Sequence, residues 1–142
     1  MRKLAWFGLL LVLPVLAQAT TAFSPTTVRE LGRYLETLPT DYYGVSPTTA
    51  KQMMDTLDVF ILDVREPAEF KDGRIPGAVN IPIRELPKRI GELPKGKPII
   101  VYCKTGNRGG QALVFLRVQG YNAKNLSGGI EAWKAANLPV AK

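Results

Sequence analysis

The sequence contains no histidine and only one cysteine among its 142 residues, and both shortages narrow the chemistry open to it. Without histidine there is no Ser-His-Asp triad, no Cys-His protease pair and no histidine metal ligand, and one cysteine does not make a thiolate zinc site. A lone cysteine also cannot close an internal disulfide, although exported proteins normally use cysteines in pairs. We therefore expect Cys103 to be a free thiol or an intermolecular partner, in a protein that uses no metal and no cofactor.

The apolar run near the amino terminus is too short for a stable membrane span. Arg2 and Lys3 precede the apolar stretch 4–16, which is about 13 residues long, whereas a spanning helix needs about 20. The sequence Ala-Gln-Ala at 17–19 then provides a small-x-small cleavage signature. We interpret residues 1–19 as a signal peptide that is removed on export to the periplasm or another extracytoplasmic compartment, which leaves no stable membrane span.

Acidic residues are the scarcer charged type: 12 Asp and Glu stand against 19 Lys and Arg, for a formal net charge of +7. Removal of residues 1–19 takes away two positive charges and no negative ones, so the formal charge falls to +5. Such an excess favours anionic partners, including small oxyanions, nucleic acids and acidic lipid surfaces. Because the basic residues are scattered and no nucleic-acid motif accompanies them, we favour a solvated basic surface and predict no nucleic-acid binding.

The length and the 46% hydrophobic content suit one globular domain, and neither repeats nor low-complexity tracts follow residue 27. Apolar residues at helical spacing predict a short amphipathic helix that begins near Thr27 and ends before Pro39. Ser46 and Pro47 then supply the cap and first turn of a second helix. We divide the chain into a signal segment at 1–19, an N-terminal extension with a short helix at 20–45, and a domain at 46–142.

Alternating strands and helices make the second part of the chain an α/β domain. The compact apolar runs at 59–62 and 98–102 are rich in β-branched or aromatic residues and predict buried strands. Weaker strands are expected at 78–80 and 123–126, and helices at about 84–92, 108–119 and 128–136. Buried runs without polar alternation are typical of a mainly parallel sheet with helices on both faces.

The only cysteine lies where such a sheet places its functional groups, directly after a buried strand. From Cys103 the loop 103–108 (Cys-Lys-Thr-Gly-Asn-Arg) leads into a helix, so backbone N–H groups and the helix N-terminus form an anion cradle, with Gly106 supplying torsional freedom. Positive potential from the cradle, Lys104 and Arg108 favours the reactive thiolate. A small buried core cysteine is the alternative, and the residues alone do not decide between the two.

Four motifs in order along the chain resemble those of the rhodanese superfamily, over residues 46 to about 140. They are the strand motif at 60–66, the segment at 73–82, the cysteine loop at 103–108 and the segment at 125–133. The resemblance implies a rhodanese-like sandwich of about five mostly parallel strands, and a cysteine that accepts sulfur from thiosulfate or a related donor. One departure is Arg74, where the family usually has histidine; it leaves the fold assignment intact.

The resemblance implies a sulfurtransferase in which the Cys103 thiolate attacks the outer sulfur of a small anionic donor and becomes a persulfide. Cyanide, a small thiol or a protein thiol partner then removes that sulfur. Lys104 and Arg108 are expected to attract the donor or orient the cradle, and Thr105 to offer a hydroxyl donor. The substrate-binding loop comprises Lys104, Thr105, Gly106, Asn107 and Arg108.

Asp63 and Arg65 follow the first strong strand at the same edge of the sheet, where they either shape the rim of the site or support the fold. We favour the structural role for both. Two other functions stay open. One is a non-catalytic sulfur carrier or interaction module of the same fold. The other, less favoured, is a phosphatase or arsenate reductase, because those enzymes have five residues between cysteine and arginine and only four separate Cys103 from Arg108.

Overall fold

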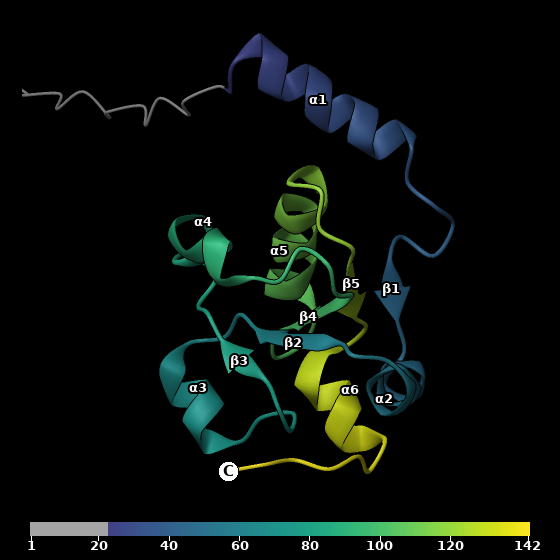
Figure 1. The fold of residues 1–142 in the computed structure, drawn as a ribbon, viewed down its shortest axis with the longest axis vertical. Coiled ribbons are helices and arrows are strands. Elements are labelled where there is room, and N and C mark those ends of the chain that lie inside the picture. The colour runs from purple at the N-terminus through teal and green to yellow at the C-terminus, as the bar shows by residue number, and fades with distance from the viewer. Residues whose placement is uncertain (1–22) are drawn as a thin grey trace, which may run out of the picture.

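The computed structural model describes residues 23–142, so the predicted signal segment and its removal lie outside the described residues. Figure 1 shows a sheet between two groups of helices, with one further helix outside them. Along the chain the elements are α1 (Pro25–Glu36), β1 (Gly44–Val45), α2 (Pro47–Thr56), β2 (Phe60–Asp63), α3 (Pro67–Asp72), β3 (Val79–Asn80), α4 (Leu86–Arg89), the 3-10 turn η1 (Ile90–Glu92), β4 (Ile99–Tyr102), α5 (Asn107–Val118), β5 (Ala123–Leu126) and α6 (Gly129–Ala135).

Serine caps followed by proline start the first two helices. This arrangement is the one predicted for α2, whereas α1 begins at Pro25, two residues before the predicted start near Thr27. The Ser24 hydroxyl accepts the Thr27 N–H at 3.2 Å, and that of Ser46 accepts the Thr49 N–H at 3.1 Å. Each cap satisfies one of the N–H groups that a helix start leaves unpaired. Helix α3 is not predicted from the sequence, because its six residues are too few to display a helical period; a capping box between Glu66 and Glu69 holds its first turn.

The five strands form one sheet in the order β1-β5-β4-β2-β3, and all four pairings are parallel. This confirms the predicted α/β architecture. The four predicted strands are present, with no end shifted by more than one residue. The fifth, β1, is a two-residue edge strand paired with β5. Strand β1 directly precedes residue 46, where we expected the domain to begin. One edge strand of the sheet therefore belongs to the predicted N-terminal extension.

Side chains of the central strand β4 alternate between two cores, one on each face of the sheet. Ile99 and Val101 belong to the core under α4 and α5, whereas Ile100 and Tyr102 belong to the core under α2 and α6. All four are essentially inaccessible to solvent. A strand that is buried on both faces has an unbroken apolar sequence, which is why the apolar run predicted its burial. In Figure 1, α4 and α5 lie above the sheet and α2 and α6 below it.

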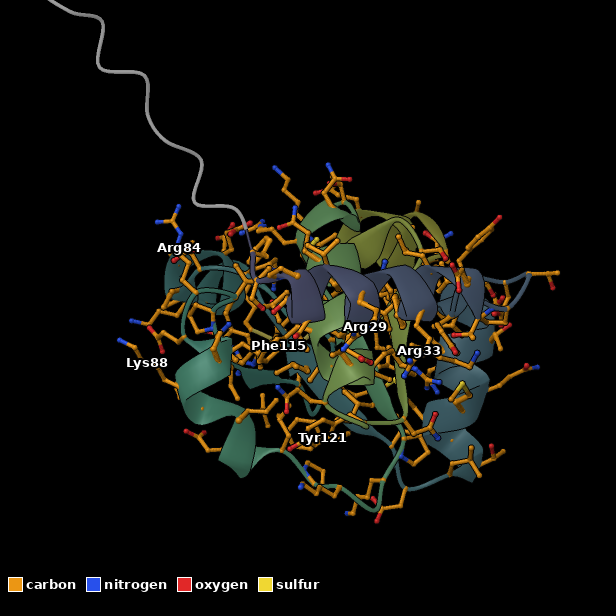
Figure 2. All side chains as sticks on the ribbon, turned by 90° about the horizontal axis from the view of Figure 1, so that it is seen from above. Arg29, Arg33, Arg84, Lys88, Phe115 and Tyr121 are labelled. Carbon is orange, nitrogen blue, oxygen red and sulfur yellow. The ribbon has the colours of Figure 1, made fainter. Side chains whose placement is uncertain are left out.

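Helix α5 is apolar on two sides, and α1 lies across its outer side. Leu113 and Leu116 face the sheet, while Val114 and Phe115 line a cavity of about 480 Å³ between α5 and α1. Figure 2 shows α1 crossing over α5, with Phe115 labelled beside it. No residue of α1 is buried, so the helix covers the outer side of α5 without sealing it.

The labelled basic side chains on this side of the molecule belong to separate elements. Arg29 and Arg33 lie on α1, where both contact Glu30, whereas Arg84 and Lys88 project from the region of α4 at the left of the view (Figure 2). Among residues 23–142, no helix combines the length and apolar character that a bilayer crossing requires.

Candidate active site

Cys103 lies at the base of the predicted loop, directly after β4. Its side chain is buried, with 1% of the residue exposed, and Sγ accepts the N–H of Gly106, with 3.1 Å between nitrogen and sulfur. Gly106 has φ 106°, in the left-handed region that favours glycine, and it caps α5. The loop therefore turns back over the sulfur and presents to it the Gly106 N–H, at the start of α5.

The start of α6 holds the loop from outside. The N–H of Ile130 donates to the Cys103 carbonyl at 2.9 Å, and the N–H of Glu131 donates to that of Lys104 at 3.1 Å. A Cβ on Gly129 would lie 2.5 Å from both carbonyl oxygens, so only glycine allows this approach. These two hydrogen bonds fix the first two residues of the loop to the start of α6.

Arg108 is held by a carboxylate that the sequence alone did not single out. Its Nη1 and Nη2 donate to Oε2 and Oε1 of Glu69 on α3, at 2.7 and 2.8 Å. These two bonds, chief among the causes, lower the pKa of Glu69 from 4.5 to about 2, and the same carboxylate raises the pKa of Arg108. A bidentate, partly buried pair fixes both groups. It therefore anchors the end of the loop to α3.

Asp63 and Arg65 form a buried ion pair below the rim. Nη2 of Arg65 donates to Oδ2 of Asp63 at 2.6 Å and to the Gly73 carbonyl at 2.7 Å, and neither residue is more than 4% exposed. The amide of Asn80 donates to the carbonyls of both residues, at 3.0 and 2.9 Å. Burial, followed by the charge of Asp63, raises the pKa of neighbouring Tyr102. These contacts join β2, β3 and β4 beneath the site.

The side chain of Arg74 takes no part in that network. Its guanidinium lies over the ring of Phe70, 4.8 Å from the centroid, and its backbone pairs with Ala141 near the carboxyl end. Within residues 23–142, Asp63 is bound by Arg65 and not by Arg74. The arginine that stands in place of the family's usual histidine therefore packs against α3.

Asn125, at the end of β5, supports the loop from beneath and was not singled out from the sequence as a site residue. Its amide nitrogen donates a long hydrogen bond to the Gly106 carbonyl, at 3.4 Å. Its buried Oδ1 has no hydrogen-bond partner among the described residues and occupies the space that a side chain on Gly109 would need. A buried acceptor without a partner is costly and tends to persist where function requires it.

The remaining loop side chains are exposed. Lys104, Thr105 and Asn107 make no side-chain hydrogen bond or ion pair within the described part of the chain. They are free to meet a ligand, whereas Arg108 is already engaged. In residues 23–142 no three Cys, Asp or Glu side chains gather as metal ligands. The site thus offers a buried sulfur nucleophile, a backbone N–H that contacts it, and the cation Lys104, which has no ion pair within residues 23–142. This set is suited to attack on a small anionic electrophile.

A family model described as "Rhodanese-like domain" matches residues 46–136. A protein named "Sulfurtransferase" from Allochromatium vinosum is 41% identical over 96 residues, which cover 67% of this chain and 90% of that protein. A "Putative sulfurtransferase" from Bacillus subtilis is 33% identical, over 58% of this chain and 80% of the relative. An uncharacterized Synechocystis protein is 39% identical over 69% of this chain, and the match spans only 55% of its length.

Solved structures resemble the fold closely. A crystal structure of a rhodanese-related protein from Thermoplasma volcanium superposes with a TM-score of 0.66 at 34% identity, covering 69% of this chain and 96% of that one. A protein from Lactobacillus plantarum gives a TM-score of 0.65 at 34% identity, covering 82% and 98%. The match to the Lactobacillus plantarum structure covers a larger share of this chain than the family model, which matches residues 46–136.

Proposed function

Because the chain belongs to the rhodanese-like domain family, we propose that it is a sulfurtransferase that carries a sulfane sulfur as a persulfide on Cys103. Relatives named as sulfurtransferases support the reaction class. The observation that carries the proposal is the contact between the Cys103 sulfur and the Gly106 N–H at 3.1 Å, at the start of helix α5.

In the first half-reaction, thiosulfate or a polysulfide-like donor brings its outer sulfur to the Cys103 thiolate. A new S–S bond forms to that sulfur, the donor's own S–S bond breaks, and sulfite or another leaving group departs with the bonding pair. Backbone N–H groups that are already oriented stabilise the charged sulfur without having to reorganise. Burial of Cys103 restricts the approach to small or extended donors.

In the second half-reaction, a thiophilic acceptor attacks the outer sulfur of the persulfide. Cyanide, a small thiol or a partner's cysteine can serve; the S–S bond to Cys103 breaks and its pair restores the thiolate. Because each half-reaction returns the enzyme to a stable state, ping-pong kinetics follow. No step in the cycle needs an outside oxidant.

Three side chains of the loop have different proposed roles. We assign attraction of the anionic donor to Lys104, whose charge is exposed and unpaired in the described residues, and hydrogen bonding to Thr105. Arg108 serves as a positioning residue through Glu69, since its guanidinium already has two carboxylate bonds.

A non-catalytic carrier of the same fold is the second candidate function. It would share the persulfide on Cys103 but would need a dedicated partner to unload it. The observation that favours it is the near-complete burial of Cys103, because a buried sulfur is less open to acceptors that diffuse freely.

Steady-state kinetics with thiosulfate and cyanide test the proposal. We expect parallel double-reciprocal plots, complete loss of turnover in Cys103→Ser with the fold retained, and no change in Lys88→Gln, an exposed residue of α4. A single sulfur loaded without turnover would identify a carrier. Turnover that survives Cys103→Ser would refute the mechanism.

A further inference from the structure

Gly106 brings a backbone N–H to the sulfur, and both of its peptide groups are held. Its N–H donates to Sγ of Cys103 at 3.1 Å. Its carbonyl accepts the Gly110 N–H at 2.8 Å and the side-chain amide of Asn125 at 3.4 Å. Gly106 has φ 106° and no side chain, so it has little torsional preference of its own. The direction of its N–H therefore depends on the groups that hold its carbonyl.

Of the two donors to that carbonyl, only Asn125 belongs to the sheet. Gly110 is part of α5, which follows directly from the loop and moves with it. Asn125 pairs with Val101 of β4 on one side, and on the other its backbone N–H donates to the Tyr43 carbonyl at 2.9 Å. Because neighbours on both sides hold its backbone, the amide of Asn125 is a fixed point of attachment for the loop.

For the stability of the fold alone, an amide at this position is a poor choice. Its Oδ1 is buried without a hydrogen-bond partner among the described residues. Its nitrogen donates one long bond to a carbonyl that the Gly110 N–H already satisfies. An apolar side chain of similar size would fill the same space beside Gly109 and leave no acceptor unpaired. The contribution of the amide must lie in the loop that it contacts.

We propose that Asn125 is a positioning residue for sulfur transfer. Its amide holds the Gly106 carbonyl, which keeps the Gly106 N–H directed at the sulfur. That donor stabilises the negative charge on Cys103, both in the attacking thiolate and when the thiolate leaves as the acceptor takes the outer sulfur. The inference rests on the persulfide mechanism proposed above and adds to it a residue that contacts neither donor nor acceptor.

Two substitutions of the same residue separate positioning from packing. Asn125→Leu approximately keeps the volume and removes both polar groups, whereas Asn125→Ala also leaves a cavity. We expect kcat/KM for thiosulfate to fall in both variants by about threefold to tenfold, the equivalent of one hydrogen bond. The midpoint of chemical denaturation should fall in Asn125→Ala only, because the leucine variant retains the packing.

The pH profile of kcat/KM is a readout that packing alone does not move. If the N–H contact weakens, the thiolate forms at higher pH, so the rise of kcat/KM should move upward in both variants by about 0.5–1 on the pH scale. Asn122→Ala is the matched control. Asn122 is an exposed asparagine directly before β5, and its amide oxygen accepts an equally long bond from Arg117, at 3.4 Å. Its profile and kcat/KM should match those of wild type.

An Asn125→Leu variant as active as wild type, with losses that follow stability, would overturn the positioning role. Wild-type pH profiles in both variants would do the same. If Asn125→Leu does not fold, the pH profile of Asn125→Ala decides the question by itself. In each of these cases the sulfurtransferase proposal stands as long as wild type forms the persulfide. If thiosulfate leaves no persulfide on wild-type Cys103, both proposals fail together.

Discussion

At the scale of single residues, the site depends on positions where the backbone must come close to a neighbour from elsewhere in the chain. Gly129 approaches two loop carbonyls, and Gly109 leaves space for the side chain of Asn125. The need for glycine at Gly106 follows from the loop that the sequence predicted. At Gly129 and Gly109 the need for glycine depends on contacts with residues distant in the chain, which no local sequence pattern reveals.

Gly109→Ala tests this packing. A Cβ at that position would overlap the Asn125 amide oxygen and lie 3.5 Å from the Cys103 nitrogen. Because the strand beneath cannot move away freely, we expect the free energy of unfolding to fall by about 1–3 kcal/mol, and sulfur transfer to slow as the loop shifts. Chemical denaturation measures the first effect.

Gly110→Ala is the matched control, one residue along the same helix. Its added Cβ would meet only the Asn125 amide nitrogen, at 3.8 Å, an ordinary contact. Relief of glycine's entropic cost in a helix should leave stability unchanged or raise it by about 0.5–1 kcal/mol. Equal destabilisation by the two substitutions would show that the Asn125 contact is not what requires glycine at position 109.

At the scale of elements, the loop is clamped between two helices that follow other strands. Helix α6 binds its carbonyls, and α3 binds Arg108 through Glu69. The sequence spacing predicted a basic end to the loop, but its carboxylate partner lies 39 residues away on a helix too short to show a period. The sequence alone therefore suggested that Arg108 attracts the donor or orients the cradle, because it does not reveal that Glu69 binds the guanidinium.

The free energy of unfolding, measured as a function of pH, tests the ion pair between Glu69 on α3 and Arg108 at the end of the loop. The pKa of Glu69 in the folded protein, about 2, lies below its ordinary 4.5. The stabilisation is therefore complete above pH 4.5 and is lost as the pH falls toward 2. Allowing for partial exposure, we expect wild type to lose about 1–2 kcal/mol more than Glu69→Gln between pH 5 and 2.

Glu36→Gln serves as the control for this titration, since Glu36 lies exposed on α1 and forms no ion pair within residues 23–142. Its acid dependence should match that of wild type. If Glu69→Gln also follows the wild-type curve, Glu69 does not hold Arg108 strongly enough to anchor the loop.

At the scale of the whole molecule, the buried strands were predictable because burial on both faces leaves long apolar runs, as at 99–102. The domain boundary was harder to place. The two-residue β1 gives no periodic signal, and only its pairing with β5 brings it into the sheet. Placement of α1 likewise depends on α5, whose outer apolar side becomes apparent only once its inner side is known.

Hydrogen exchange, followed by mass spectrometry of peptides from each element, tests how firmly α1 belongs to the domain. Because none of its residues is buried, its opening should cost far less than global unfolding. We expect α1 amides to exchange about 100-fold or more faster than those of β4. Similar protection in both would mean that α1 unfolds only together with the core.

The most direct test of the central claim is the intact mass of the protein before and after incubation with thiosulfate, and again after cyanide. We predict a gain of about one sulfur atom, removed by cyanide with formation of thiocyanate, and no gain in Cys103→Ser. An unchanged mass with both thiosulfate and polysulfide, in folded protein whose Cys103 thiol is reduced, would contradict a persulfide on this residue.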